Sequence, residues 1–126
     1  MSSLDKLNKA KQLIRKSLDQ RITSYAYQAN HNQLKFTFRD GSVLYVIYNR
    51  IGEYAYQLLF SKQSLDRVRF DSMDKEWNVD TKPNHFHPRG DKKGYRSPMI
   101  GNPEDDIPEL VKLILSGELK NRTKRF

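Results

Sequence analysis

The stretch LKFTFRDGSVLYVIY, residues 34–48, decides how this chain folds. Apolar and polar side chains alternate over residues 34–38, which predicts a strand with one buried face. Asp40 and Gly41 form the dipeptide that most strongly signals a tight hairpin turn, because both tolerate positive φ. Residues 43–48 are apolar on both faces, as we expect for a central strand that is covered on both sides. The stretch therefore predicts an antiparallel hairpin inside a sheet.

The period of two continues on both sides of this hairpin. It predicts further strands over residues 22–29, 53–60 and 65–70. Their short connections require antiparallel neighbours, because parallel pairing needs a long crossover. We therefore expect a five-stranded antiparallel meander. Its many tyrosines and phenylalanines are expected to pack across strands, and base stacking on exposed tyrosines is the alternative use of these rings.

Two amphipathic helices are predicted to flank the meander. Residues 3–19 place apolar side chains at helical spacing behind a serine cap. Residues 107–115 carry a second apolar stripe, and Gly117 is suited to end that helix in a left-handed conformation. We expect an α+β fold, with an N-terminal helix and a C-terminal helix that packs on the sheet.

The composition describes a small, strongly basic protein of 126 residues, with a net charge of +8 and an isoelectric point near 9.7. Its length suits one domain, which we place at residues 1–117, followed by a basic and mobile tail, residues 118–126. The charge suits a phosphate-rich partner, an anionic membrane surface or an acidic protein, and a merely soluble surface is the alternative. Because cysteine is absent, disulfides, thiolate zinc sites and a cysteine nucleophile are excluded.

No membrane segment is expected from the sequence. Spanning a bilayer as a helix takes about 20 consecutive apolar residues, and no run in this chain approaches that length. The N-terminal residues lack the apolar core of a signal peptide. We therefore expect a cytoplasmic protein that has no membrane partner.

Residues 81–97, TKPNHFHPRGDKKGYRS, combine imidazoles and positive charge more densely than any other segment. His85 and His87 are spaced so that both rings point to one side of a short extended segment and Phe86 to the other. Two imidazoles provide the base and the acid that metal-independent RNA cleavage needs, because imidazole titrates near neutral pH. Nearby residues would supply positive charge, a carboxylate and a hydroxyl. The candidate catalytic residues are His85, His87, Arg69, Asp71, Arg89 and Tyr95.

Two other interpretations of the histidines remain open. H-x-H on a strand gives two metal ligands and Asp71 or Asp91 a third, although the dense positive charge opposes a divalent cation. Alternatively, both imidazoles only satisfy backbone groups of a long loop. We expect no metal, since no third ligand stands at a fixed spacing from the two histidines, and no cofactor, since Gly-rich phosphate loops and zinc-finger spacings are absent. Phosphate contacts are expected from Arg67, Lys82, Lys92, Lys93, Arg96, Lys120, Arg122, Lys124 and Arg125.

The order of elements and three short segments resemble the TumE family of toxin–antitoxin proteins. The matching segments are Arg69-Phe70-Asp71, Pro83-Asn84-His85-Phe86-His87 and the apolar stripe of the closing helix. Ser72 stands where that family usually has Asn, and MDKEW follows where further histidines are common. The resemblance implies a toxin that acts on RNA and is neutralised by a cognate antitoxin. The alternative is a non-catalytic basic module that binds nucleic acid or an acidic protein, and a homodimer is compatible with both.

Overall fold

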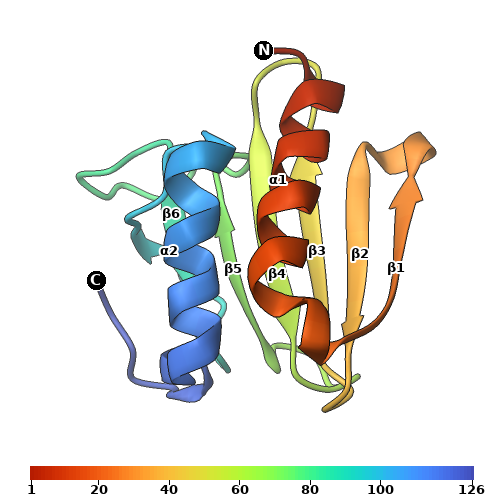
Figure 1. The fold of residues 1–126 in the computed structure, drawn as a ribbon. Helices are drawn as coiled ribbons and strands as arrows, with labels where there is room; N and C mark the ends of the chain where they lie inside the picture. The colour runs from red at the N-terminus through yellow and green to blue at the C-terminus, as the bar shows by residue number, and fades with distance from the viewer.

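The computed structural model describes all residues from 1 to 126 and is an α+β fold (Figure 1). Its elements are α1 (Ser3–Leu18), β1 (Ile22–Gln28), β2 (Gln33–Phe38), β3 (Val43–Tyr48), β4 (Tyr54–Leu59), β5 (Arg67–Asp71), β6 (His85–His87), β7 (Tyr95–Arg96) and α2 (Pro103–Ser116). The strands form one sheet in the order of the chain, and every neighbouring pair is antiparallel. The predicted fold class, an antiparallel meander between two helices, is confirmed.

The sheet has seven strands, so the expectation of five is wrong in number. The two additional strands, β6 and β7, are three and two residues long. A segment this short, punctuated by Pro88, Gly90 and Gly94, shows no alternation that a sequence pattern can detect. Pairing with the existing edge extends the sheet instead, since Phe86 of β6 lies opposite Phe70 of β5 and Tyr95 of β7.

The ends of both helices follow the predicted signals. Ser2 caps α1 and forms a capping box with Asp5, which satisfies backbone N–H groups of the first turn. Asn102 accepts a hydrogen bond from the backbone N–H of Glu104 at the start of α2. At the other end Gly117 takes φ 77°, a conformation that a residue with a Cβ rarely adopts. None of the helices has the length and apolar character required to cross a membrane.

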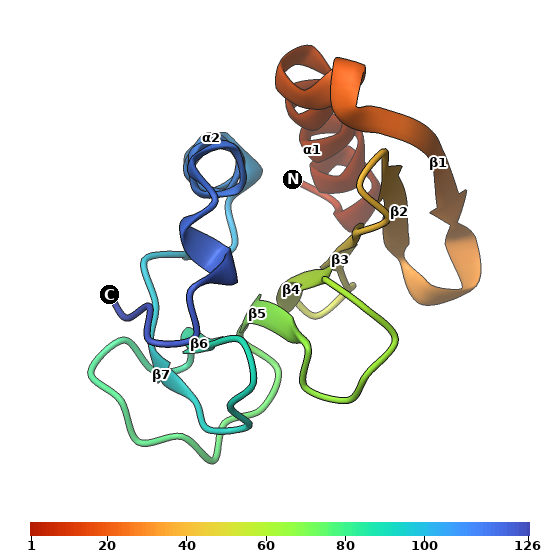
Figure 2. The same cartoon turned by 90° about the horizontal axis from the view of Figure 1, so that it is seen from below.

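Both helices pack on one face of the sheet, and the opposite face carries no helix (Figure 2). In β3 the side chains of Leu44, Val46 and Tyr48 are buried against the helices, whereas the alternate residues remain half-buried. The expected cover on both sides of this strand is therefore wrong. The helix-free face is less enclosed because only loops lie against it.

The pleat of β5 and β6 decides on which face the candidate site lies. Phe70 and Phe86 are fully buried in the core below α2. Successive side chains of a strand point to opposite faces, so Asp71, His85 and His87 project to the helix-free face. The predicted orientation of the His85–Phe86–His87 segment is confirmed.

The C-terminal residues lie against the domain and do not extend from it as a mobile arm. Leu119 is 1% exposed, and the ring of Phe126 packs 5.7 Å from that of Phe70 and 4.9 Å from that of Phe86. Because most residues of this segment are charged or polar, its sequence pattern does not indicate that Leu119 and Phe126 are packed against the domain. The tail therefore has a defined position against β5 and β6, near the β7 edge of the sheet.

Candidate functional site

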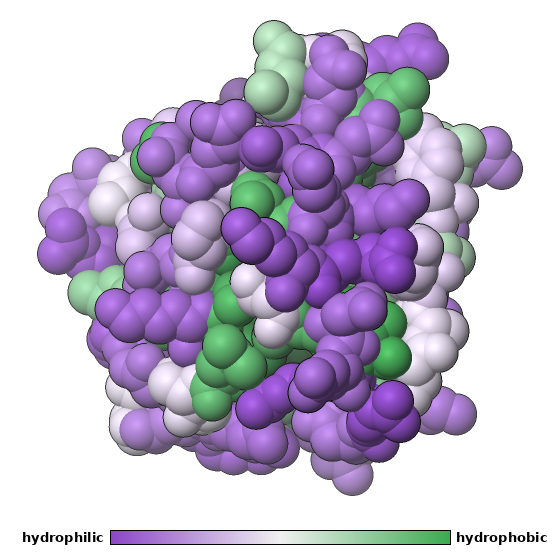
Figure 3. Space-filling view, in the orientation of Figure 1, coloured by the Kyte–Doolittle hydropathy of each residue, from purple (hydrophilic) through white to green (hydrophobic).

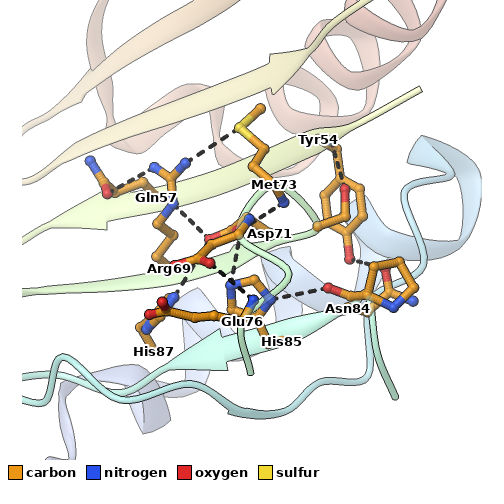
Figure 4. A network of polar contacts seen from close by, with 12 residues as sticks. Tyr54, Gln57, Arg69, Asp71, Met73, Glu76, Asn84, His85 and His87 are labelled. Atoms are coloured by element: carbon orange, nitrogen blue, oxygen red, sulfur yellow. Dashed lines mark hydrogen bonds and ion pairs between the residues drawn. The ribbon is translucent and has the colours of Figure 1, made fainter. Parts of the chain in front are cut away.

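Asp71 lies at the centre of a group of polar side chains on the helix-free face (Figure 4). Its Oδ1 is 3.0 Å from Nε2 of His85, and its Oδ2 is 3.7 Å from Nε2 of His87. Arg69 Nε donates a hydrogen bond of 2.8 Å to Oδ2. Asp71 is the register partner of His85, and Arg69 that of His87, so pairing of β5 with β6 assembles the four residues. We call Arg69, Asp71, His85 and His87 the β5–β6 cluster.

Backbone carbonyls fix the orientation of both imidazoles. His85 Nδ1 lies 3.0 Å from the carbonyl oxygen of Pro83, and His87 Nδ1 lies 3.0 Å from that of Lys93. Because a carbonyl oxygen can only accept, each Nδ1 carries a proton and donates it. In a neutral ring the lone pair of Nε2 then faces Asp71. His85 Nε2 is close to the carboxylate but not aligned for a hydrogen bond, and it has no other partner.

The environment moves the pKa values of the cluster in different directions. Burial alone would raise the pKa of Asp71, but contact with His85 and Arg69 holds it below its ordinary value. Burial opposes charge on His85, yet the carboxylate of Asp71 outweighs it and raises the pKa of His85. The pKa of His87 is lowered, because burial dominates and Asp71 compensates it only in part. The two imidazoles are therefore chemically distinct.

Three of the four residues of the cluster are closed to solvent. His85 is 1% exposed, Asp71 2% and His87 8%. Trp77, in the loop between β5 and β6, covers His87 with its ring 5.8 Å from the imidazole in an edge-on arrangement. Gly94 allows this cover, because a Cβ at that position would lie 2.6 Å from the indole. A nucleotide therefore has no direct access to His85 in this structure.

Among the other candidate catalytic residues, two lie apart from the cluster. Arg89 pairs with Asp66 at 2.6 Å and stacks its guanidinium 4.5 Å from the ring centre of Phe60. Tyr95 is the register partner of Phe86, on the core-facing side of β7, and its hydroxyl donates to Asp91. The structure brings Arg69, Asp71, His85 and His87 together and holds Arg89 and Tyr95 in contacts of their own.

The residues expected to contact phosphate are concentrated along the 81–97 loop and the tail that lies beside it. Arg122 places its guanidinium against Gly90, and Arg125 lies 3.6 Å from Asp91 and over the ring of Tyr95. Arg89 also donates to the backbone carbonyl of Lys120. We call the exposed basic residues of these two segments the basic surface: Lys82, Lys92, Lys93, Arg96, Lys120, Arg122 and Arg125.

Two further predicted phosphate ligands have structural contacts. Arg67 donates to the backbone carbonyls of Pro88 and Asp91, at 2.9 and 3.0 Å, and so holds the turn that follows β6. Lys124 pairs with Glu118 and lies over the ring of Phe126. Arg67 is half-buried on the helix-free face, next in line to Arg69, and Lys124 is likewise half-buried. These contacts leave both residues less free to bind phosphate than the lysines of the loop.

Two residues that sequence reasoning left out of the site contribute to it. Gln57 of β4 accepts a hydrogen bond of 3.1 Å from Arg69, its register partner on β5. Trp77, expected only to anchor its loop, forms the cover of His87. The register of β4 on β5 would have indicated that Gln57 lies beside Arg69. No pattern in the sequence indicates where Trp77 packs.

A separate cleft lies on the helix-covered side of the sheet, between the C-terminal end of α2 and the ends of β2 and β4 (Figure 3). Its volume is about 260 Å³. Its apolar wall is formed by Phe38, Leu58, Phe60, Leu113, Ile114 and Leu119. Arg21, Arg39 and Lys120 line it as well, and Lys120 is its one residue in common with the predicted phosphate ligands. The cleft is thus distinct from the β5–β6 cluster.

Comparison with known proteins gave one result. A family model described as Toxin TumE matches residues 9–116. The matched span contains the whole β5–β6 cluster and most of both helices, and it ends before the tail. The searches of curated proteins and of solved structures returned no match.

Proposed function

We propose that this chain, which belongs to the TumE toxin family, is the toxin of a toxin–antitoxin pair and acts on RNA. The observation that carries the proposal is the basic surface, where the 81–97 loop and the C-terminal tail lie side by side. Lysine and arginine side chains at that density attract a polyanion. A cognate antitoxin is the protein partner that this function requires, and a homodimer is not part of the proposal.

Of the two modes of action on RNA that the sequence leaves open, we propose binding as the primary one. Metal-independent cleavage by His85 and His87 requires that both imidazoles reach the reacting oxygens. The burial of both rings, and the cover of His87 by Trp77, count against this mode. The lysines of the basic surface, by contrast, are exposed and need no rearrangement to contact phosphate.

The first prediction is that the protein binds a generic single-stranded RNA with an affinity that falls as salt rises. Each phosphate contact on a single strand contributes a slope of about −0.7 in log K against log salt, so four or five contacts give about −3. Replacing Lys92 and Lys93 with alanine removes up to two contacts and should flatten the slope by about 1 to 1.5. A fluorescence-anisotropy titration at several salt concentrations measures it.

The matched control is the pair Lys16→Ala and Lys112→Ala, two exposed lysines on the outer sides of α1 and α2. This pair should leave the slope unchanged, since neither lysine belongs to the basic surface. Affinity that does not vary with salt would exclude RNA as the partner of the basic surface. RNA that is shortened during the incubation, and stays intact with His87→Gln, would instead establish cleavage.

The second prediction concerns toxicity in cells. Expression of the wild-type chain should arrest bacterial growth, and the Lys92→Ala, Lys93→Ala variant should relieve the arrest, because toxicity depends on contact with RNA. Optical density after induction measures the effect, with Lys16→Ala, Lys112→Ala at equal protein level as the control. Full toxicity of the loop variant would contradict a role for the basic surface.

A further inference from the structure

Three side chains direct ligand atoms toward one buried point between β5 and β6. One ligand atom from each of Asp71, His85 and His87 lies within 4.8 Å of the other two. The closest approaches are 3.0 Å for His85 Nε2 and 3.7 Å for His87 Nε2, each to an oxygen of Asp71. A tetrahedral ion with bonds of about 2.0–2.2 Å separates its ligands by about 3.4 Å. The distance from His85 to Oδ1 is shorter than that value and the distance from His87 to Oδ2 is longer, so the side chains would shift slightly to share one ion.

Both imidazoles are oriented with Nε2 toward Asp71. Their Nδ1 atoms donate to the carbonyls of Pro83 and Lys93, so a neutral ring directs its Nε2 lone pair at the carboxylate. For His85 this lone pair and a carboxylate oxygen, 3.0 Å apart, repel unless a proton or a metal ion lies between them. His85 Nε2 is buried without a hydrogen-bond partner, which is costly and rare in folded proteins. Histidines that bind metals are held in the same way, with the distal nitrogen donating to a carbonyl.

We propose that Asp71, His85 and His87 form a binding site for a first-row divalent transition metal ion, with Zn²⁺ as the representative. Two imidazoles and one carboxylate select such ions over Mg²⁺ and Ca²⁺, which prefer oxygen ligands. Of the two carboxylates that the sequence offered as third ligand, the structure favours Asp71, since it is Asp71 that lies within 4.8 Å of a ligand atom of both imidazoles.

Arg69 sets the charge around this site. It donates to Oδ2 of Asp71 and so orients the carboxylate, while Oδ1, which also accepts the backbone N–H of Met73 at 2.9 Å, is the oxygen nearer to His85. Its positive charge also weakens attraction for a cation. A bound ion would tie β6 to β5 and fix the loop that carries Trp77. The site involves no step on RNA, so it goes beyond the proposed function and does not depend on it.

Trp77 provides a direct readout, because it is the only tryptophan of the chain and its ring lies 5.8 Å from that of His87. Co²⁺ in the site should quench Trp77 fluorescence, saturate at one ion per chain, and add visible absorption bands; Zn²⁺ should displace Co²⁺ and restore the emission. The experiment uses the untagged full chain without RNA. The variant His31→Gln should behave identically, since it retains only His85 and His87 as histidines.

Two variants test the ligands themselves. Asp71→Asn preserves the shape of the side chain, and His87→Gln removes one imidazole; each should weaken Co²⁺ binding at least about tenfold. Near-ultraviolet circular dichroism checks that both remain folded. Absence of saturable quenching in the wild type or in His31→Gln would overturn the proposal, and that measurement needs no change in the cluster. So would unchanged affinity in a folded Asp71→Asn variant. Since no RNA is present, either result leaves the proposed function standing.

Discussion

Replacing Asp106 with alanine is expected to lower the free energy of unfolding by about 3–5 kcal/mol, since several buried donors would lose one charged acceptor. Asp106 is 2% exposed at the start of α2. It accepts hydrogen bonds from the Tyr56 hydroxyl at 2.7 Å and from the backbone N–H groups of Ile100 and Gly101 at 3.0 and 2.7 Å. The Tyr56 hydroxyl also contacts that of Tyr48. One carboxylate thus joins α2, the preceding loop and the sheet.

The neighbouring residue is the matched control. Asp105 occupies the same first turn of α2 but is exposed, and its side chain contacts that of Asn102. Asp105→Ala should cost no more than about 1 kcal/mol, because it loses only an exposed hydrogen bond from Asn102 and a solvent-screened interaction with the helix dipole. Urea denaturation followed by circular dichroism measures both variants. Equal losses for the two variants would refute the role assigned to the buried carboxylate.

Replacing Phe86 with alanine should also lower the free energy of unfolding by about 3–5 kcal/mol, through the lost apolar burial and the cavity left behind. Phe86 is fully buried and is the only residue of β6 that faces the core. Its ring packs 4.7 Å from that of Phe70 and 4.9 Å from that of Phe126. Because β6 is three residues long, this one side chain holds the strand in place. The loss should therefore also open the β5–β6 cluster.

Hydrogen exchange separates the local effect from the global one. The measured quantity is the ratio of amide exchange rates in β6 to those in β2 and β3. This ratio should be larger in Phe86→Ala than in the wild type. Ile51→Ala is the control, since Ile51 is a large apolar residue that is 79% exposed, and it should change stability by less than about 0.5 kcal/mol. A Phe86→Ala loss as small as that of the control would exclude Phe86 from the core.

The sequence alone determined the elements whose signals are local. Alternation over residues 34–38 and 43–48, with Asp40 and Gly41 between them, fixed the central hairpin, because side-chain burial in a strand repeats every two residues. Helical spacing, a serine cap and Gly117 predicted both helices in the same way, while the structure decided that Ser2 and Asn102 are the N-terminal caps. The family resemblance was likewise carried by short segments, and it is confirmed.

The tertiary structure alone decided which residues form the site. Asp71 and His85 are fourteen positions apart, and they meet because β5 and β6 pair in one register; a shift by one residue would turn both imidazoles into the core. That register is set by Phe70 and Phe86, which must be buried together. The cover by Trp77 and the anchoring of the tail by Phe126 depend on contacts with no sequence period. Non-local packing therefore determined which residues contact His85 and His87 and how the site is closed. The local sequence pattern only identified the two histidines and the nearby charged residues as candidates.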